Sequence, residues 1–449
     1  MSQRDAFTST FGVLVATLGS AVGLGNIWKF PYLTGTNGGA GFLLVYLLAT
    51  LLVGLPVMIA EIMLGRTARA NAVSTLAQLA PRQPLWQSIG YMGLLAAVLI
   101  LAFYTEVAGW VFAYIVKALR GQLQFTDPHS AAAAFGALVG SPWQALLWQW
   151  LVLAFTGGII MLGVSKGIEA VTKRLMPLLF LLLFLLCVRS LTLPGAMAGL
   201  AFLLQPDFGK ITTSVVLTAL GLAFFKLSIG MGTMITYGSY FRDEQNIPAT
   251  ALRVMLADLS VSLLAGVAIF PAVFAFGFAP SAGPSLVFMT IPAVFYSMPG
   301  GSLFMTLFFV LTAIAATGAI LSILEVPVAM LTERLGWHRR KATLVTLFTI
   351  ALLGVPAALS HGVTAGWKLF GLNPFELFDF ISSNILLPLG GILIALFAGW
   401  VYGLPKLRDA LSNHGQLQNT RIIGLLYLLT RYVAPLLVAV ILLKGLNVF

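Results

Sequence analysis

Long apolar segments recur along the whole chain and are separated by short polar connections. Most are about twenty residues or longer, the length that an α-helix needs to cross about 30 Å of hydrocarbon. Pro284 and Pro292 interrupt the stretch 283–298, which is too short to span and is expected to be an external re-entrant or capping segment. The pattern predicts eleven membrane spans, at 10–34, 39–64, 88–118, 144–163, 171–190, 212–240, 248–277, 303–332, 341–360, 375–402 and 421–446.

Composition agrees with this pattern. Hydrophobic residues make up 59% of the chain and charged residues only 9%, whereas a soluble domain carries about a quarter charged residues. A net charge of +11 could indicate a nucleic-acid partner, but the basic residues cluster beside the apolar segments. With the N-terminus inside, they concentrate in the cytoplasmic connections, which is the positive-inside pattern. We therefore expect a multi-pass membrane protein without a cleaved leader, with its C-terminus outside and no nucleic-acid partner.

Enzymatic and metal chemistry have little support. The four histidines fall in predicted connections and share no ligand spacing, so no metal site is expected beyond a possible sodium site. GVSKG (163–167) formally matches a nucleophile elbow, but no strand is predicted before it and no motif places a histidine near Ser165. Neither an enzyme nor an organic cofactor is expected.

Glycine-rich interruptions occur in two of the apolar segments. GSAVGLGN (19–26) lies in the first segment and SIGMG (228–232) in the sixth, about 210 positions further on. Interrupted helices at matching positions are typical of transporters built from inverted repeats around a site at the membrane midplane. Glycine used only for close helix packing is the alternative. The predicted organisation is a first repeat at 1–190, a second at 212–402 and an additional helix at 421–446.

One lysine lies in the most apolar surroundings. FFKLSIGMG (224–232) places Lys226 near the middle of the membrane, sixteen positions from the nearest basic residues, Lys210 and Arg242. An unpaired lysine is costly there, and a stem that reaches about 6 Å cannot carry its charge to an interface roughly 20 Å away. Lys226 is therefore expected to have polar partners inside the protein.

Several motifs together resemble the neurotransmitter:sodium symporter family, which includes the LeuT-type bacterial amino-acid transporters. They are SAVGLGNIWKFPY (20–32), NGGAGF (37–42), IAEIMLGR (59–66), AFYTEVAGW (102–110), FFKLSIGMGTMITYGSY (224–240), AGVAIFPAVFAFG (265–277) and FDFISSNILLP (378–388). The resemblance implies an all-α LeuT-type fold with two inverted five-helix repeats plus one extra helix. It also implies secondary transport of amino acids by alternating access across a bacterial cytoplasmic (inner) membrane.

The resemblance further implies a substrate site between the two broken helices. Backbone amides at the first break and the Tyr104 phenol would bind a carboxylate, because a half-helix N-terminus favours an anion. Carbonyls of Ala21 and Phe225, with the Ser228 hydroxyl, would bind an amino group. The side-chain pocket lacks an acid and contains the adaptable Met231, so a neutral, hydrophobic or aromatic amino acid is expected. The implied substrate-binding residues are Ala21, Gly23, Leu24, Gly25, Asn26, Ile100, Tyr104, Val107, Phe225, Lys226, Ser228, Met231, Ser322 and Ile323.

Charged residues elsewhere match gates and braces of the family. An outer gate would pair Lys29 with Asp379, and an inner gate would pair Arg4 with Glu333. Glu61 matches an acid that braces the broken first helix. Two further acids within spans are functional candidates or structural braces, namely Glu106 and Glu325.

Both sodium sites of the family are altered. The first would retain Ala21, Asn26 and Asp258, but Lys226 stands where the family has a hydroxyl. The second would retain only backbone carbonyls, because its two hydroxyl positions fall on glycine and alanine. A shift of one residue would bring Thr317 into one of these positions but would not fill both. The residues of this degraded second site are Gly19, Val22, Ala315, Gly318 and Ala319.

These changes motivate a hypothesis about Lys226. Its ammonium has three donors and no acceptor, so it could satisfy Asp258, Asn26 and the substrate carboxylate and supply the charge of sodium. A purely structural pair with Asp258 and a lipid-facing lysine are the alternatives. Transport is then expected to be sodium-independent, whether facilitated, by exchange or coupled to protons. Sodium-coupled symport through a residual second site and a ligand-binding sensor without transport remain open, as do the particular amino acid, the direction of transport and the oligomeric state.

Overall fold

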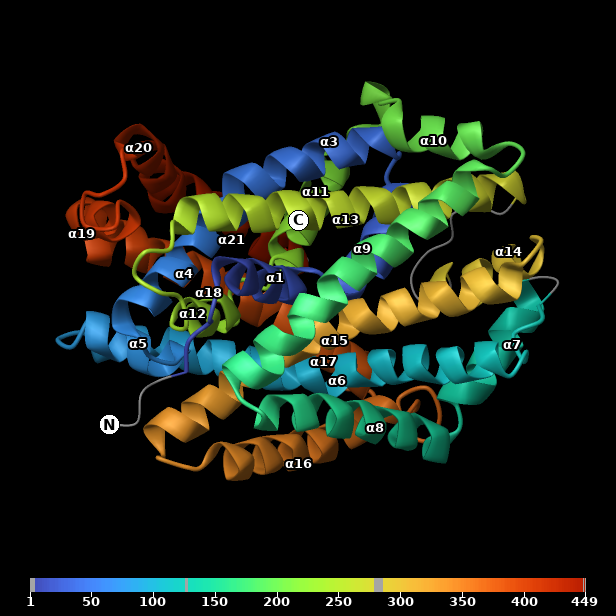
Figure 1. Ribbon diagram of the computed structural model, residues 1–449, viewed down its shortest axis with the longest axis horizontal. Coiled ribbons are helices and arrows are strands. Elements are labelled where there is room, and N and C mark those ends of the chain that lie inside the picture. The colour runs from blue at the N-terminus through green and yellow to red at the C-terminus, as the bar shows by residue number, and fades with distance from the viewer. Residues whose placement is uncertain (1–4, 126–127, 278–285, 447, 449) are drawn as a thin grey trace.

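The structure is a computed structural model that describes residues 5–125, 128–277, 286–446 and 448. It is a bundle of helices in which the longest lie side by side along one axis (Figure 1). The described helices are α1 (Thr10–Ala21), α2 (Phe30–Thr36), α3 (Ala40–Ala49), α4 (Leu55–Ala68), α5 (Ala72–Leu79), α6 (Gln87–Leu119), α7 (Pro128–Val139), α8 (Pro142–Met161), α9 (Ala170–Leu191), α10 (Ala196–Leu204), α11 (Thr213–Lys226), α12 (Thr233–Gly238), α13 (Ile247–Ala275), α14 (Ile291–Tyr296), α15 (Gly301–Arg334), α16 (Arg339–Ala358), α17 (Pro374–Asp379), α18 (Leu387–Leu396), α19 (Gly403–Leu411), α20 (Thr420–Leu428) and α21 (Ala434–Gly445).

The predicted spans correspond to these helices. Within the described residues, nine helices are long and apolar enough to cross a membrane, or ten when the bent pair formed by Thr10–Ala21 and Gly25–Thr36 counts as one. The sixth predicted span is the exception, because α11 and α12 are its two separate halves and each is short. Several spans continue through short π-helical segments, such as Phe380–Leu386 between α17 and α18.

Both predicted interruptions are real breaks. The first helix ends at Ala21 and resumes at Gly25 with a bend of 55°. The second break runs between Lys226 and Thr233, where Ser228, Gly230 and Gly232 have φ values of 53°, 84° and 75°. A side chain at Gly230 would meet the Leu387 carbonyl oxygen at 2.4 Å, so glycine is required there both for its conformation and for the close approach of α18.

The segment predicted as a cap is described from Leu286 onward, and residues 283–285 lie outside the described part of the chain. It contains the π-helical turn Leu286–Thr290 and α14. Phe288 packs against Trp110 and Tyr114 of α6, and its carbonyl accepts a hydrogen bond of 3.2 Å from the Tyr114 hydroxyl. The segment therefore covers one end of α6, as expected for a cap.

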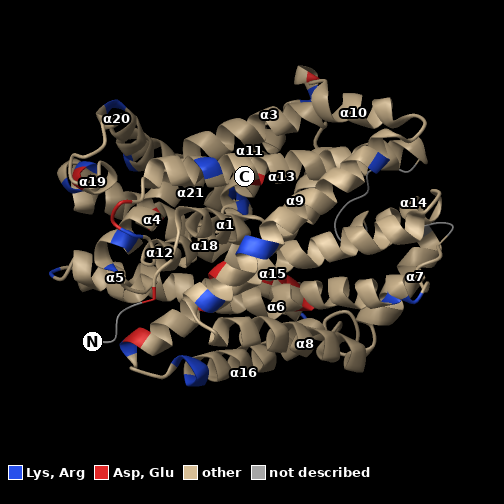
Figure 2. Cartoon of the chain, viewed as in Figure 1, with Lys and Arg blue, Asp and Glu red and all other residues tan. Residues whose placement is uncertain are grey.

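Charge is distributed unequally between the two ends of the bundle. Figure 2 shows Lys and Arg concentrated around the N-terminus, α5 and α19, with fewer at the opposite end near α7 and α10. This is the distribution on which the predicted orientation depends, and the orientation itself remains a prediction.

Candidate functional site

Lys226 is the last residue of α11, immediately before the break in the sixth span. Its ammonium nitrogen Nζ donates hydrogen bonds to Tyr46 Oη at 2.8 Å and to Asp258 Oδ2 at 3.0 Å, and a third to Ser262 Oγ. The side chains of Lys226 and Asp258 are both 0% exposed. All three donors of the ammonium are therefore satisfied by oxygen atoms of α3 and α13.

Asn26 completes this cluster from the other broken helix. Its side-chain nitrogen donates to Asp258 Oδ1 at 2.7 Å and to Ser262 Oγ at 3.1 Å. Its side-chain oxygen accepts from the Gly23 amide at 3.1 Å, which satisfies one of the amides released by the first break. The cluster thus ties both breaks to α13.

The expected contacts of Lys226 are partly different in the structure. The contact with Asp258 is present, whereas Asn26 reaches the lysine only through their shared partners Asp258 and Ser262. Sequence reasoning missed Tyr46 and Ser262. Ser262 follows Asp258 by four positions, so helical spacing places the two on one face and could have revealed it. Tyr46 is 180 positions from Lys226, and no local pattern links them.

A small cavity lies between the two breaks. It has a volume of about 40 Å³. Its wall includes ten of the predicted substrate-binding residues together with Ser20 and Ala319, of which the first was not anticipated and the second was assigned to the second ion site. The lining residues are Ser20, Ala21, Gly23, Gly25, Ile100, Tyr104, Phe225, Lys226, Ser228, Met231, Ala319 and Ile323.

Polar groups at the first break point toward this cavity. Tyr104 lies beside it, and its hydroxyl oxygen accepts a 2.8 Å hydrogen bond from the Leu24 amide. The Ser228 hydroxyl donates to the Ser20 carbonyl at 2.8 Å, so it links the sixth span to the first. The structure therefore brings the predicted carboxylate-binding and amine-binding groups together in one small space.

Not all predicted residues line this cavity. Leu24 and Val107 line a neighbouring space instead, Asn26 belongs to the lysine cluster, and the Ser322 hydroxyl donates to the Ala319 carbonyl of its own helix at 2.8 Å.

The neighbouring space is a vestibule of about 400 Å³. Gly25, Tyr104 and Phe225 line both it and the small cavity, so these residues separate the two. Lys29 and Asp379 both line the vestibule, but among the described ion pairs they do not form one. The two residues of the predicted outer gate therefore face the same space without an ion pair between them in this structure.

Ionisable side chains around this vestibule contact uncharged neighbours. Lys29 Nζ lies 4.1 Å from the centre of the Phe225 ring, and Asp379 Oδ1 accepts from the Ser383 hydroxyl at 2.7 Å. His361 packs against the rings of Trp110 and Phe375, with ring centres 5.5 and 5.6 Å away. Burial lowers the pKa of the His361 imidazole from its ordinary value of 6.5, although the Glu376 carboxylate opposes this shift.

At the second predicted ion site, α15 and α1 approach each other closely. A Cβ atom at Gly318 would lie 2.6 Å from the Gly19 carbonyl oxygen, so α15 and α1 touch backbone to backbone at this point. Thr317 does not move into the site, because its hydroxyl donates to the Ala313 carbonyl of its own helix at 2.8 Å. A side chain at Gly318 would therefore collide with the Gly19 carbonyl oxygen.

The end of the bundle that is predicted to face inward is held by a different set of contacts. Glu325 forms a two-point ion pair with Arg339, at 3.0 and 2.5 Å, and accepts from the Tyr240 hydroxyl at 2.7 Å. Glu333 accepts hydrogen bonds from the Asn71 amide and side chain. Arg4, the other half of the predicted inner gate, lies outside the described residues.

The expectation for Glu61 was wrong in one respect. Its carboxylate accepts a 2.6 Å hydrogen bond from the Gly230 amide, so it braces the broken sixth span and not the first. The amide is available because the positive φ of Gly230 takes it out of any helix. Glu106 is fully buried, and within the described residues neither of its carboxylate oxygens has a hydrogen-bond partner.

Two broken spans around a central polar site, reached from a vestibule, define a multi-pass membrane transporter. A model of the sodium:neurotransmitter symporter family matches residues 4–134 and 138–449. The chain belongs to this family.

Several individual proteins resemble this chain over nearly its whole length. The uncharacterized sodium-dependent transporter YhdH of Bacillus subtilis (strain 168) is 41% identical over 438 residues, which cover 98% of this chain and 97% of that protein. An uncharacterized sodium-dependent transporter of Haemophilus influenzae is 36% identical over 457 residues, covering 99% and 98%. The solved structure of MhsT in complex with L-phenylalanine has a TM-score of 0.90 and 43% identity, covering 99% of this chain and 100% of that one. The expected LeuT-type fold is thereby confirmed.

Proposed function

We propose that the protein is a sodium-independent secondary transporter of neutral, hydrophobic or aromatic amino acids, in which Lys226 replaces the cation of the first sodium site. The observation that carries the proposal is the Lys226 ammonium, which lies within hydrogen-bonding distance of Tyr46, Asp258 and Ser262. The protein would transport its substrate by alternating access between the vestibule and the inner face.

Electrostatics supports this role for Lys226. Asp258 carries a negative charge in a place that is 0% exposed, and such a charge is costly unless a cation compensates it. A lysine attached to the chain provides that cation permanently, whereas a sodium ion provides it only when bound. A second cation at the same oxygens would be repelled at about 3 Å, so a lysine and a sodium ion compete for this position.

The second sodium site offers no replacement. Because Gly318 lies against the Gly19 carbonyl, this carbonyl faces protein and not an ion cavity. With one site held by an ammonium and the other closed by packing, transport driven by the amino-acid gradient, by exchange or by protons is expected. The fixed charge of Lys226 makes the site insensitive to external sodium.

The substrate proposal follows from the cavity wall. Ile100, Met231 and Ile323 supply apolar contacts, and the only charged lining residue, Lys226, has its donors bound to other groups. MhsT binds L-phenylalanine, and its similarity extends over this whole chain. A cavity of about 40 Å³ is too small for an aromatic ring. The flexible Met231 side chain would therefore have to move when such a substrate binds.

The proposal includes a location. We place the protein in a bacterial cytoplasmic membrane with the N-terminus inside and the C-terminus outside, because its relatives include bacterial transporters and its basic residues gather at the N-terminal end of the bundle. The vestibule then faces outward.

A sodium-coupled symporter is the second candidate, favoured by the names of the relatives in Bacillus subtilis and Haemophilus influenzae. In that case sodium would bind to backbone carbonyls near Gly19 after α1 and α15 separate. A ligand-binding sensor without transport is the candidate from another class, and it would bind amino acids but move none.

Uptake by purified protein in liposomes tests the proposal. Vesicles loaded with unlabelled L-phenylalanine should accumulate external labelled L-phenylalanine by exchange, and L-leucine should compete whereas L-glutamate and L-lysine should not. Binding without accumulation would support the sensor. Competition by charged amino acids alone would contradict the proposed substrate class.

A Tyr104→Phe variant is the matched check of the site. It removes the hydroxyl that faces the Leu24 amide while it keeps the ring. Exchange should weaken about tenfold or more, as expected when one hydrogen bond to a charged carboxylate, roughly 1.5–3 kcal/mol, is lost. Unchanged exchange would remove Tyr104 from the site.

A further inference from the structure

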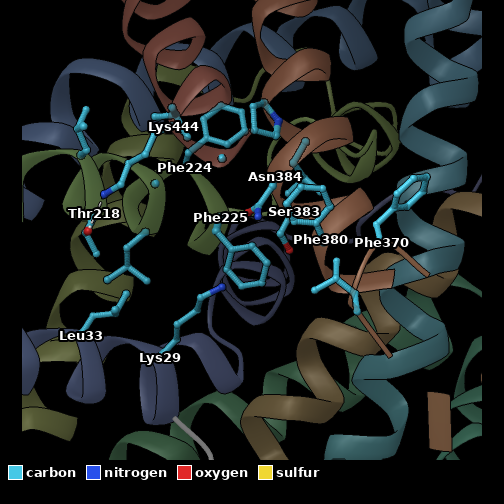
Figure 3. Close-up of a pocket in the computed structure, with 18 residues that line it drawn as sticks. Lys29, Leu33, Thr218, Phe224, Phe225, Phe370, Phe380, Ser383, Asn384 and Lys444 are labelled. Atoms are coloured by element: carbon cyan, nitrogen blue, oxygen red, sulfur yellow. Dashed lines mark hydrogen bonds between the residues drawn. The ribbon is translucent and has the colours of Figure 1, made fainter. Parts of the chain in front are cut away.

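A second cavity adjoins the outer gate but lies apart from the substrate site. It has a volume of about 620 Å³, larger than the vestibule. Its walls come from α11, the segment 380–388 of the tenth span, the end of α21 and the connection at Phe370 and Leu372 (Figure 3). None of the residues assigned to the substrate or ion sites lines it except Phe225.

The charges of this cavity have one sign. Among the described residues, its charged lining residues are Lys29 and Lys444, and no acidic side chain lines it. Lys444 Nζ donates to the Thr218 hydroxyl at 2.9 Å and to the Ser214 carbonyl at 3.2 Å, both uncharged acceptors. Lys29 Nζ lies over the face of the Phe225 ring. Within the described residues neither ammonium has an anionic partner within salt-bridge distance, so an anion in this cavity would be attracted by both charges.

The rest of the wall is apolar. Figure 3 shows the rings of Phe224, Phe225 and Phe380 around the cavity. Leu217 and Ile441 add aliphatic surface from α11 and α21. A ligand that fits this wall carries negative charge at one end and hydrocarbon at the other.

The position of the cavity indicates where such a ligand comes from. Lys444 lies one residue before the end of α21, the last span, where a lysine reaches the level of the lipid headgroups. This last span is only 22% buried in its most apolar window, and Leu436 and Leu443 on it are 68% and 41% exposed. The lipid bilayer therefore borders the cavity along α21.

We propose that this cavity binds an anionic phospholipid of the outer leaflet, with its phosphate at Lys29 and Lys444 and an acyl chain along Phe224 and Ile441. Basic pockets between spans recognise anionic headgroups in this manner. The occupant is a phospholipid because a lipid-facing helix forms one wall of the cavity.

The site would act on the outer gate. Lys29 and Phe225 line both this cavity and the vestibule, so a ligand in either space can contact the same lysine. A phosphate at Lys29 holds its ammonium away from Asp379 and favours the arrangement without an ion pair seen here. This regulatory step rests on the proposed transport cycle, whereas binding of the lipid does not.

Lipid binding is measured directly, without transport. Purified protein is titrated with phosphatidylglycerol, and bound lipid is counted by native mass spectrometry. Lys444→Gln, which retains a donor for Thr218, should weaken phosphatidylglycerol binding about fivefold, roughly the value of one basic residue at an anionic surface. Lys368→Gln, an exposed lysine of the same outer connection, should leave binding unchanged.

Three outcomes would overturn the proposal of a lipid site. Equal loss in the Lys444 and Lys368 variants would show a general charge effect. Equal binding of phosphatidylcholine would show an uncharged groove, and binding of oleate in place of phosphatidylglycerol would show a fatty-acid site. If lipid binding is lost as expected while exchange activity is absent in every protein, the lipid site stands and the proposed transport function falls.

Discussion

The two regions predicted as ion sites are built in different ways. At the first, Lys226 brings its ammonium to Asp258, Tyr46 and Ser262. At the second, no acid is present among the predicted residues and Gly318 of α15 lies against the Gly19 carbonyl of α1. The first site therefore keeps its charge balance, and the second keeps only its packing.

This difference has a physical basis. The first site contains Asp258, a buried acid that must be compensated in every state of the protein. The second predicted site contains carbonyls and no acid, so its cation can be given up without leaving a buried charge. A site with a fixed negative charge requires a substitute cation, whereas a site of dipoles can be closed by packing.

Removing the ammonium should have the largest effect. Lys226→Met leaves Asp258 buried without a cation and should lower the free energy of unfolding by about 3–5 kcal/mol. The thermal unfolding temperature in detergent measures this loss. Lys226→Met combined with Asp258→Asn should recover most of it, since the unpaired charge is then gone. A single variant as stable as the parent would show that the pair is not needed for charge balance.

Filling the second site should have a smaller effect. In Gly318→Ser the new Cβ atom would be 2.6 Å from the Gly19 carbonyl oxygen, so α1 and α15 must separate, at a cost of about 3 kcal/mol.

Ala319→Ser is the control, because Ala319 already has a Cβ atom and faces the small cavity. It should be close to the parent in thermal stability. The contrary result would be a Gly318→Ser variant that is as stable as the parent and is stabilised further by sodium. The second site would then be open to the ion, and the proposed difference between the two ion sites would be wrong.

Removing one acceptor of the ammonium should have the smallest effect. Tyr46→Phe deletes the hydroxyl that lies 2.8 Å from Lys226 Nζ and should cost about 1.5 kcal/mol. Tyr237→Phe is a matched control, since Tyr237 is fully buried and its hydroxyl has no partner within the described residues. Equal stability of the two variants would show that the Tyr46 contact contributes nothing.

The fold was predictable because its determinants are local. Apolar length fixed the spans, and the glycine clusters at 19–26 and 228–232 marked both breaks. A count by helix length alone misses the sixth span, since the break leaves two short halves. Motifs were needed to identify it.

The site was predictable only where a sequence pattern or the family resemblance indicated the contact. The Lys226–Asp258 pair followed from the motifs, and Ser262 could have followed from its spacing to Asp258. Tyr46 could not, because its contact with Lys226 depends on how α3 crosses α11. The ion pair of Glu325 with Arg339 and the brace from Glu61 to Gly230 likewise depend on packing between separate helices.

The central claim is that the Lys226 ammonium replaces the first sodium ion as the cation that compensates Asp258. The most direct measurement is exchange of labelled L-phenylalanine by protein in liposomes, in sodium or in choline, for the parent and for Lys226→Ser. The account predicts equal exchange in both salts for the parent. It predicts exchange only in sodium for Lys226→Ser, whose hydroxyl could help Asp258 and Asn26 bind the ion. Exchange by the parent that stops in choline would contradict the account.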